Sequence, residues 1–308
     1  MHHNHNKVHH KVKKQHLHSL ENESIYVLRE VAANFQRPVV MYSVGKDSSV
    51  LIHLIRKAFY PEPIPFPLLH IDTGYKFREM IEFRDQFSTK IGARLIVSRN
   101  EEAIAKGSHP AKYGVAKCCN LLKTTALLQG LADGQFDAAI GGARRDEERA
   151  RAKERFFSVR DVFGQWDPKN QRPELWNTYN TRLNEGETMR VFPLSNWTEI
   201  NIWEYIEQEG IPIVPLYYAR KRKVIRRNGM WLPVAYLNDR QPEEMVEERS
   251  IRFRSLGCAP CTGAVESYAT SVADIIAEVQ QAKRSERETR MIDHGNNTME
   301  DKKREGYF

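Results

Sequence analysis

Short apolar segments alternate along the chain with longer segments of helical periodicity. Five apolar runs of strand length occupy residues 38–42, 66–72, 94–98, 136–142 and 189–194. Between and before them, apolar residues recur at helical spacing over 20–35, 48–60, 76–90 and 118–132. Buried strands that alternate with helices indicate a parallel sheet with helices on both faces. We therefore predict an α/β fold with a doubly wound parallel sheet of about five strands.

The character of the chain changes at both ends of this pattern. Residues 1–19 are rich in histidine and lysine and offer too little apolar surface to fold, so we predict a disordered leader there. Residues 20–215 carry the α/β pattern. After about residue 215 the chain becomes basic and rich in turn residues. We predict an irregular C-terminal lobe over 216–308, which would offer a partner or substrate surface.

Hydropathy and charge argue against a membrane protein. The mean hydropathy is −0.61 and the apolar content is 41%, values typical of soluble globular proteins. No run of eighteen apolar residues is present, and the N-terminus lacks the apolar core of a secretory signal. We therefore expect a cytoplasmic protein without membrane contact. The net charge of +7 includes the basic run 220–227, which is more often a solvated loop than a nucleic-acid site.

A candidate phosphate-binding loop follows the first predicted strand. Its sequence is Ser43-Val44-Gly45-Lys46-Asp47-Ser48, and an amphipathic helix comes next. Backbone N–H groups at a helix start, a glycine and a lysine together favour phosphate oxygens. The loop departs from the pattern G-x-x-x-x-G-K-[ST], because Val40 and Asp47 replace the glycine and the hydroxyl. The alternative is an ordinary strand-to-helix turn capped at Asp47 or Ser48.

Polar residues also follow two other predicted strands. Asp72-Thr73-Gly74 ends the second, and Arg144 and Arg145 follow two glycines at the end of the fourth. Because ligands of doubly wound sheets bind at the carboxyl ends of strands, we expect these groups to face one crevice. Guanidinium forks suit tetrahedral oxyanions, which makes both arginines candidates for binding an anion. Arg252 and Arg254 alternate like one strand face and are further anion-binding candidates.

The loop resembles the pyrophosphate loop of the adenine-nucleotide α-hydrolase superfamily, whose members cleave ATP between its α and β phosphates. Longer blocks resemble the small, catalytic subunits of bacterial sulfate adenylyltransferase, in the branch related to PAPS reductases. They include PFPLLHIDTGYKFREM, FDAAIGGARRDEERARAKER, RVFPLSNWTE and the terminal GYF. The resemblance runs from about residue 20 to the C-terminus. It implies that 20–215 binds ATP and that sulfate attacks the α-phosphorus, with pyrophosphate as the leaving group.

The resemblance also implies roles for individual residues. ATP and its pyrophosphate would be bound by Ser43, Val44, Gly45, Lys46, Ser48, Ser49, Asp72, Thr73 and Gly74. Catalysis would fall to Lys46, Asp47, Arg144 and Arg145, with Asp47 near Mg²⁺. Sulfate is already ionised, so positioning and cations would replace a general base. The GTP-hydrolysing large subunit of the family would be a separate polypeptide, because this chain lacks the P-loop pattern.

Four cysteines stand in two pairs, Cys118-Cys119 and Cys258-x-x-Cys261. They resemble the ligands of the [4Fe–4S] cluster in adenylyl-sulfate reductases, whereas sulfate adenylyltransferase small subunits keep only the first cysteine of the second pair. On count alone, four thiolates suit an Fe–S cluster or tetrahedral zinc, and a redox disulfide or unlinked thiols would also account for them. Reductase activity is less favoured, because the chain lacks the cysteine-bearing C-terminal tail of those reductases.

Two further functions stay open. An ATP pyrophosphatase that activates DNA or tRNA for sulfur insertion would use the same loop, an Fe–S cluster, a cysteine desulfurase and a nucleic-acid partner. The basic N-terminus and the run 220–227 would suit that function. A nucleotide-sensing binding module is the third option. The length of the resemblance to the sulfate enzymes favours sulfate adenylyltransferase.

Overall fold

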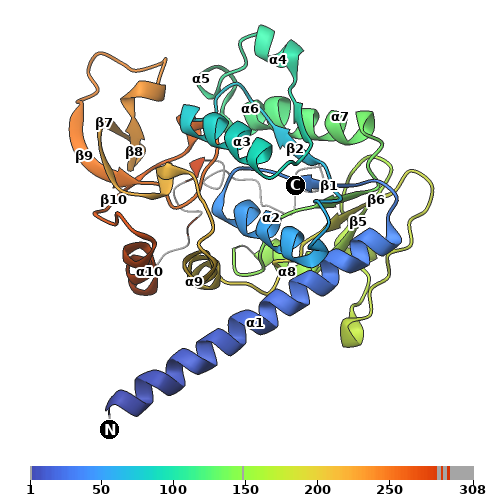
Figure 1. Cartoon of the computed structure of the whole chain (residues 1–308). Helices are drawn as coiled ribbons and strands as arrows, with labels where there is room; N and C mark the ends of the chain where they lie inside the picture. Colours follow the sequence, from blue (N-terminus) through green and yellow to red (C-terminus); the bar gives the residue numbers. More distant parts are fainter. Residues whose placement is uncertain (1, 148, 283–285, 287–289, 292–308) are drawn as a thin grey trace.

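The computed structural model describes residues 2–147, 149–282, 286 and 290–291. Its centre is a six-stranded sheet in the order β3-β2-β1-β4-β6-β5 (Figure 1). The strands are β1 Pro38–Met41, β2 Leu68–Ile71, β3 Leu95–Ser98, β4 Ala138–Ile140, β5 Phe157–Arg160 and β6 Thr188–Val191. The doubly wound parallel sheet and its five predicted strands are thus confirmed. β5 was not predicted, because it directly follows a highly charged helix, and it pairs antiparallel with β6 at the sheet edge.

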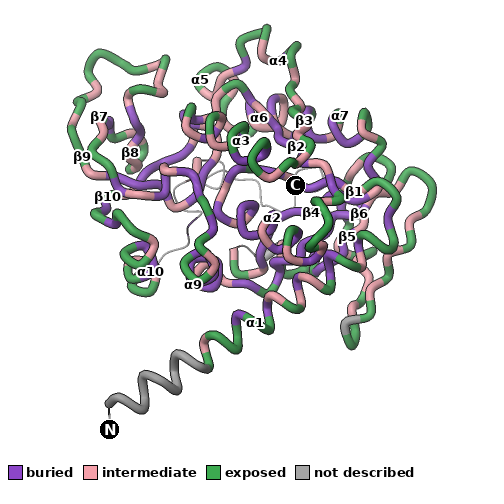
Figure 2. Tube along the Cα trace, in the orientation of Figure 1, coloured by how far each residue is buried: buried purple, intermediate pink, exposed green. Residues whose placement is uncertain are grey.

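Helices cover both faces of this sheet. One core contains residues of α1 His2–Asn34, α2 Lys46–Phe59 and α3 Arg78–Lys90, and a second core contains residues of α7 Thr125–Asp133. Val40 of β1 packs in the first core and its neighbour Val39 in the second. Successive strand residues point to opposite faces, so a strand buried on both sides is apolar throughout. Figure 2 shows this buried trace in the sheet strands and in α2.

The order of the strands reverses between β1 and β4. From β1 the chain proceeds to β2 and β3 on one side, and it then returns to β4 on the other side. Val40 is in register with both Leu68 of β2 and Ile140 of β4, so the ends of these strands align. The connections diverge at this switch point and leave a crevice at the carboxyl ends of β1 and β4.

The N-terminal helix is longer than expected. α1 begins at His2, within the segment 1–19 for which a disordered leader was predicted. Leu17 and Leu20 are buried in the main core, and Lys13 pairs with Glu204 of α9 (Glu199–Glu209). Once a helix is nucleated, each further residue adds a hydrogen bond, and a few tertiary contacts suffice to extend it. In Figure 1 the N-terminal part of α1 projects beyond the sheet.

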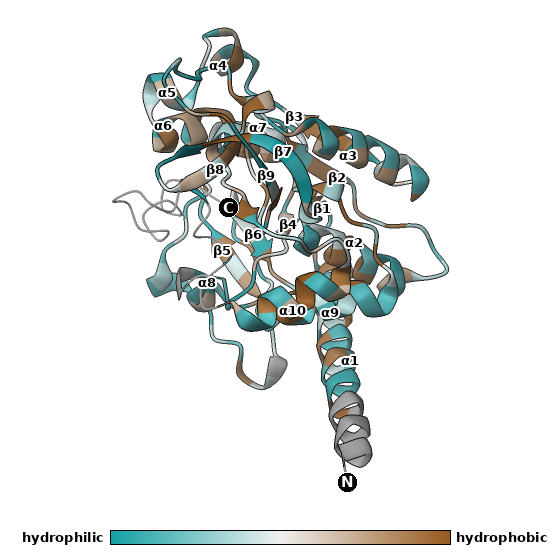
Figure 3. Ribbon diagram, turned by 90° about the vertical axis from the view of Figure 1, so that its left-hand side faces the viewer, coloured by the Kyte–Doolittle hydropathy of each residue, from teal (hydrophilic) through white to brown (hydrophobic). Residues whose placement is uncertain are grey.

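The C-terminal lobe is regular where an irregular lobe was predicted. It holds an antiparallel sheet in the order β10-β9-β7-β8, with α10 packed against α9. The elements are α9 Glu199–Glu209, β7 Arg220–Arg227, β8 Met230–Pro233, β9 Glu247–Arg252, β10 Val265–Glu266 and α10 Val272–Gln281. The basic run 220–227 is therefore strand β7, which Figure 3 shows as hydrophilic. Val224 and Ile225 are its buried residues, and Arg222 pairs with Glu79 at 3.0 Å.

Short helices complete the described chain. They are α4 Glu101–Ala105, α5 Pro110–Tyr113, α6 Val115–Cys119 and α8 Arg149–Glu154. One π-helical turn over Asn120–Thr124 joins α6 to α7. Residues 292–308, which include the terminal GYF, lie outside the described part. None of the described helices is both long enough and apolar enough to cross a bilayer.

Candidate active site

The candidate phosphate loop forms the bend between β1 and α2. Gly45 is the N-cap of α2, and its carbonyl accepts hydrogen bonds from the hydroxyls of Ser48 at 2.9 Å and Ser49 at 3.1 Å. The backbone N–H of Lys46 donates to the hydroxyl of Tyr217 at 2.8 Å. These contacts hold the loop in a defined shape at the start of a helix, where anions bind favourably.

Two backbone positions set this shape. Val44 has a φ of +65°, in the left-handed region that costs a β-branched residue on the order of 1–2 kcal/mol. Its side chain is fully buried, so core packing offsets the cost. Gly142 lies against the loop from the end of β4. A Cβ atom there would lie 3.1 Å from Cβ of Asp47 and 3.3 Å from the backbone nitrogen of Ser48. Glycine is therefore needed for this close approach.

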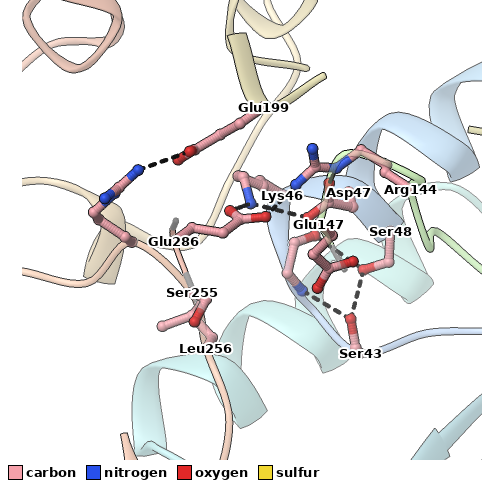
Figure 4. Close-up of polar contacts among 12 residues, drawn as sticks. Ser43, Lys46, Asp47, Ser48, Arg144, Glu147, Glu199, Ser255, Leu256 and Glu286 are labelled. Carbon is pink, nitrogen blue, oxygen red and sulfur yellow. Dashed lines mark hydrogen bonds and ion pairs between the residues drawn. The ribbon is translucent and has the colours of Figure 1, made fainter. Parts of the chain in front are cut away.

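Four charged residues form a buried cluster beside the loop, here named the charge cluster: Lys46, Asp47, Arg144 and Glu286 (Figure 4). Arg144 Nε donates to Asp47 Oδ1 at 2.7 Å, and Lys46 Nζ donates to Asp47 Oδ2 at 3.0 Å. Glu286 accepts from both cations, with Oε2 toward Lys46 Nζ and Oε1 toward Arg144 Nη2. The switch point has thus brought together the ends of β1 and β4, as the sequence predicted for Lys46, Asp47 and Arg144.

The pKa values in the charge cluster follow from burial and mutual attraction. Burial alone lowers the pKa of Lys46 and of Arg144, but Asp47 and Glu286 outweigh it and raise both. Burial raises the pKa of Asp47, but Lys46 and Arg144 outweigh it and hold that pKa below its ordinary value. Burial also raises the pKa of Glu286, and the two cations oppose this effect. Both cations are therefore charged at neutral pH.

A cavity opens next to the loop, at the carboxyl ends of β1 and β2. Part of its lining is apolar and comes from Met41, Leu69, Ile71 and Leu127. Ser43, Asp47, Ser48, Gly142 and Glu147 line it near the loop. Four cations also line it: Lys76, Lys123, Arg151 and Arg290. An apolar pocket with convergent polar groups is the usual form of a small-ligand site.

Not all predicted ATP-binding residues reach this cavity. Ser43, Ser48 and Thr73 line it, as does Asp47 of the predicted catalytic set, whereas Val44, Gly45, Lys46, Ser49, Asp72 and Gly74 do not. The Asp72 carboxylate accepts from the Gly74 N–H at 2.9 Å and lies 3.7 Å from Arg99, so it shapes the turn after β2. Ser49 donates to the Gly45 carbonyl and so stabilises the loop, and Lys46 belongs to the charge cluster.

The predicted arginines are divided among several contacts. Arg144 belongs to the charge cluster, but Arg145 turns to Ser195, donating from Nε at 2.8 Å, and stacks over Phe156. Neither lines the cavity. Arg252 donates to Glu278 at 2.7 Å and Arg254 to Glu199 at 2.8 Å, also outside the cavity lining. The structure therefore unites only Arg144 with the loop.

The four cysteines all line the cavity. Cys118 and Cys119 come from α6, and Cys258 and Cys261 flank a short turn that pairs with the residues after β2 through Lys76. Burial raises the pKa of Cys118 to about 12 and also raises the pKa of Cys119 and Cys261, so these thiols are protonated at neutral pH. Within the described residues, no three His, Cys, Asp or Glu side chains are arranged to hold a metal ion.

Several residues of the site were missed by sequence reasoning. Glu147 carried a weak signal in its i,i+4 spacing to Arg151; the two form an ion pair at 3.5 Å, and both line the cavity. Lys76 and Lys123 follow the predicted Asp72-Thr73-Gly74 and cysteine motifs closely in sequence. Tyr217 and Glu286 had no local signal, since only the tertiary fold brings the C-terminal half to the loop.

Comparisons with known proteins find a matching family, similar sequences and a similar solved structure. The family model described as "Phosphoadenosine phosphosulfate reductase domain" matches residues 37–264. A protein of Vibrio parahaemolyticus named "Sulfate adenylyltransferase subunit 2" is 59% identical over 297 residues, covering 95% of this chain and 98% of that protein. A protein of Myxococcus xanthus with the same name is 57% identical, covering 95% and 97%. A solved phosphoadenylyl-sulfate reductase of Candida auris is 16% identical, with a TM-score of 0.44, covering 66% of this chain and 89% of that chain.

Proposed function

The chain belongs to the phosphoadenosine phosphosulfate reductase domain family and, within it, to the family of sulfate adenylyltransferase subunit 2, and on this premise we propose that it transfers the adenylyl group of ATP to sulfate. The products are adenylyl sulfate and pyrophosphate. The observation that carries the proposal is the high identity to these relatives over nearly the whole of both chains. The functions that use nucleic acid as the acceptor have no comparable support.

The loop and the charge cluster would hold the leaving group. Ser43 and Ser48 present hydroxyls to the cavity, and Lys46 and Arg144 supply two fixed cations beside them. Pyrophosphate gains negative charge as the bond to the α-phosphorus breaks, and preorganised donors stabilise that charge without reorganisation. We assign the β and γ phosphates to this end of the cavity and the adenine to the apolar lining around Leu69 and Leu127.

Mg²⁺ would bind at the same end. Asp47 and Glu147 both line the cavity near the loop, and carboxylate oxygens together with phosphate oxygens are the ligands that Mg²⁺ prefers. When bound, the ion would neutralise phosphate charge. Asp47 also holds Lys46 and Arg144 in place, so its removal would disturb the loop as well as the metal.

The attacking sulfate needs cations on the far side of the α-phosphorus. Among the described residues, Lys76, Lys123, Arg151 and Arg290 are the cations that line the cavity, and we propose that sulfate binds among them. Arg145, Arg252 and Arg254 are weaker candidates, because none of them lines the cavity. In-line attack then requires only that sulfate and the loop hold opposite sides of the α-phosphorus.

The chain acts with a partner subunit, since its relatives are named as subunit 2. We propose that this partner is a separate GTP-hydrolysing polypeptide and that the enzyme is cytoplasmic, where ATP is available. Exposed apolar side chains at Phe163, Leu175 and Trp176 offer a surface for it, with exposed fractions of 73%, 61% and 90%. Large exposed apolar groups of this kind are typical of protein interfaces.

The four cysteines are a candidate metal site in addition to this chemistry. Four thiols that share one cavity have the donor chemistry of a zinc or [4Fe–4S] site, provided that the side chains turn toward a common centre. Lys76, Lys123 and Arg290 would offset the negative charge of four thiolates. Metal analysis and absorbance near 400 nm of anaerobically purified protein test this directly, with the Cys118→Ser/Cys119→Ser variant as the control.

The activity is tested by pyrophosphate release from ATP with sulfate, with and without the GTPase subunit, compared with DNA or tRNA plus a cysteine desulfurase. Sulfate-dependent release is expected. Lys46→Met should abolish it, whereas Lys57→Met on the same helix should retain it, because Lys57 pairs with Glu21 and Glu209 outside the cavity. Release that depends on nucleic acid and ignores sulfate would contradict the proposal.

A further inference from the structure

Glu286 is a part of the charge cluster that the phosphate loop and the strand ends do not account for. It lies 240 residues from Lys46 along the chain, and only 4% of it is exposed. Its two carboxylate oxygens bridge Lys46 Nζ and Arg144 Nη2. A phosphate group also presents two oxygens to a lysine and a guanidinium fork. In Figure 4 the Glu286 side chain reaches the loop from a separate part of the chain.

Each of the three nitrogens of Arg144 contacts a carboxylate. Nε donates to Asp47 at 2.7 Å, Nη1 lies 3.3 Å from Asp146, and Nη2 donates to Glu286. Lys46 Nζ is shared between Asp47 and Glu286. The Arg144 side chain has no exposed surface, so a polyphosphate can reach it only if one of these carboxylates moves away. Asp47 belongs to the loop itself and Asp146 lies two residues from Arg144, so Glu286 is the partner that can leave without rebuilding the loop.

The formal charges of the charge cluster also point to Glu286 as the group that is displaced. Within the charge cluster, two cations (Lys46 and Arg144) face two carboxylates (Asp47 and Glu286), so their formal charges sum to zero. The cavity is lined at this end by Asp47 and Glu147, while Lys46 and Arg144 do not line it. A polyphosphate would meet acidic groups first. Departure of Glu286 removes one negative charge from around Lys46 and Arg144 and frees one donor on each cation.

We propose that Glu286 occupies the pyrophosphate subsite in the nucleotide-free enzyme and is displaced by the β and γ phosphates of ATP, which take over its contacts with Lys46 and Arg144. This inference rests on the proposed function, since it assigns those phosphates to the charge cluster. The carboxylate keeps two buried cations paired while the site is empty. ATP must break these contacts to bind, so Glu286 lowers the affinity for nucleotide.

The test compares Glu286→Gln and Glu286→Ala with the wild type in the full-length chain. The probes are Mg·ATP and inorganic pyrophosphate with Mg²⁺, each measured by titration calorimetry. We expect both variants to bind both probes about tenfold more tightly, the equivalent of about 1.4 kcal/mol. The nucleotide-free variants should melt at a lower temperature, and ATP should raise their Tm by more than it raises that of the wild type.

The matched control is Glu244→Gln. Glu244 also holds an arginine with both oxygens, accepting from Arg227 Nε at 2.8 Å and Nη2 at 2.9 Å, but it lies in the C-terminal lobe outside the cavity lining. The affinity of the Glu244→Gln variant for both probes should match that of the wild type. Glu286→Asp, which keeps the charge but shortens the reach, should bind the probes with intermediate affinity and serves if the neutral variants fail to fold.

Two results would overturn the inference. Weaker or unchanged binding of both probes by the Glu286 variants would mean that the carboxylate does not compete with phosphate. Unchanged affinity with a reduced kcat would make Glu286 a positioning residue for Lys46 and Arg144 instead. If the wild type itself binds neither probe, the proposed function fails as well, and this outcome is distinguishable because it does not depend on the variants.

Discussion

Arg144 Nε and Asp47 Oδ1 lie 2.7 Å apart, although 97 residues separate the two in the chain. The contact joins the segment after β4 to the loop after β1, across the point where the strand order reverses. The Arg144 side chain has no exposed surface, so the pair is screened little by water. It fixes the position of a loop carboxylate and of a buried cation at the same time.

Arg144→Met tests how much stability this pair contributes. The substitution leaves Asp47 and Glu286 with one cation between them in a buried environment, and such a change typically costs about 3–5 kcal/mol of unfolding free energy. Urea unfolding at pH 7 measures it. Arg227→Met is the control, since its pairs with Asp239 and Glu244 are partly exposed and should cost only about 1 kcal/mol. If both variants lost the same unfolding free energy, the buried Arg144–Asp47 pair would contribute no more to stability than a partly exposed pair.

Gly142→Ala should weaken ATP binding. The new Cβ would lie 3.1 to 3.3 Å from Asp47 and Ser48, so the loop must shift, at a cost of about 1–3 kcal/mol. We expect a KM for ATP raised at least tenfold in the sulfate-dependent assay. Gly92→Ala is the control: Gly92 has a φ of +66° and open space around it, so alanine there strains only the backbone. That variant should lose stability and keep the KM; an unchanged KM for Gly142→Ala would refute the close-approach argument.

His70 should make the protein sensitive to acid. Burial, with a contribution from Lys76, lowers its pKa to about 3, and its Nδ1 contacts the Tyr42 carbonyl at 2.8 Å. The ordinary value is about 6.5. Between about pH 6.5 and pH 3, His70 binds a proton in the unfolded chain but stays neutral in the folded chain. Stability therefore falls as the pH falls from about 6.5 toward 3.

His70→Gln removes this titration and keeps a hydrogen-bond donor near the Tyr42 carbonyl. Urea unfolding at pH 7 and pH 5 should show that the wild type loses more stability than the variant, by about 2 kcal/mol, which is 1.36 kcal/mol for each of 1.5 pH units. Equal losses in both proteins would show that His70 accepts a proton in the folded state.

Trp176→Ala should weaken binding of the partner subunit without destabilising the chain. Trp176 is 90% exposed, so its removal should change the unfolding free energy by less than about 0.5 kcal/mol. Buried interface tryptophans often contribute about 2 kcal/mol or more, so the dissociation constant should rise about thirtyfold. Tyr60→Ala, at a position 83% exposed, is the control. An unchanged dissociation constant for Trp176→Ala would place the interface elsewhere.

Local pattern was sufficient for the strands and for the loop. Val39 and Val40 are both apolar because the two faces of β1 pack against different helices, and this requirement is visible in four consecutive residues. The order of elements then predicts that polar groups after β1 and β4 meet. Strand β5 escaped prediction because it directly follows a highly charged helix. The regular C-terminal sheet escaped it because the basic residues of β7 find acidic partners, such as Glu79, that are distant in sequence.

The fold class, the place of the loop between β1 and α2, and the family could all be inferred from the amino-acid sequence, because they depend on short-range periodicity and on residues that are adjacent in the chain. Which of the predicted residues share the cavity was settled by the packing of the folded chain. It separated Arg144 from Arg145, gathered Cys118, Cys119, Cys258 and Cys261 around one cavity, and brought Glu286 onto Lys46. Charge pairing and burial act through space, so the partner of a buried cation can come from any part of the chain that the packing brings near.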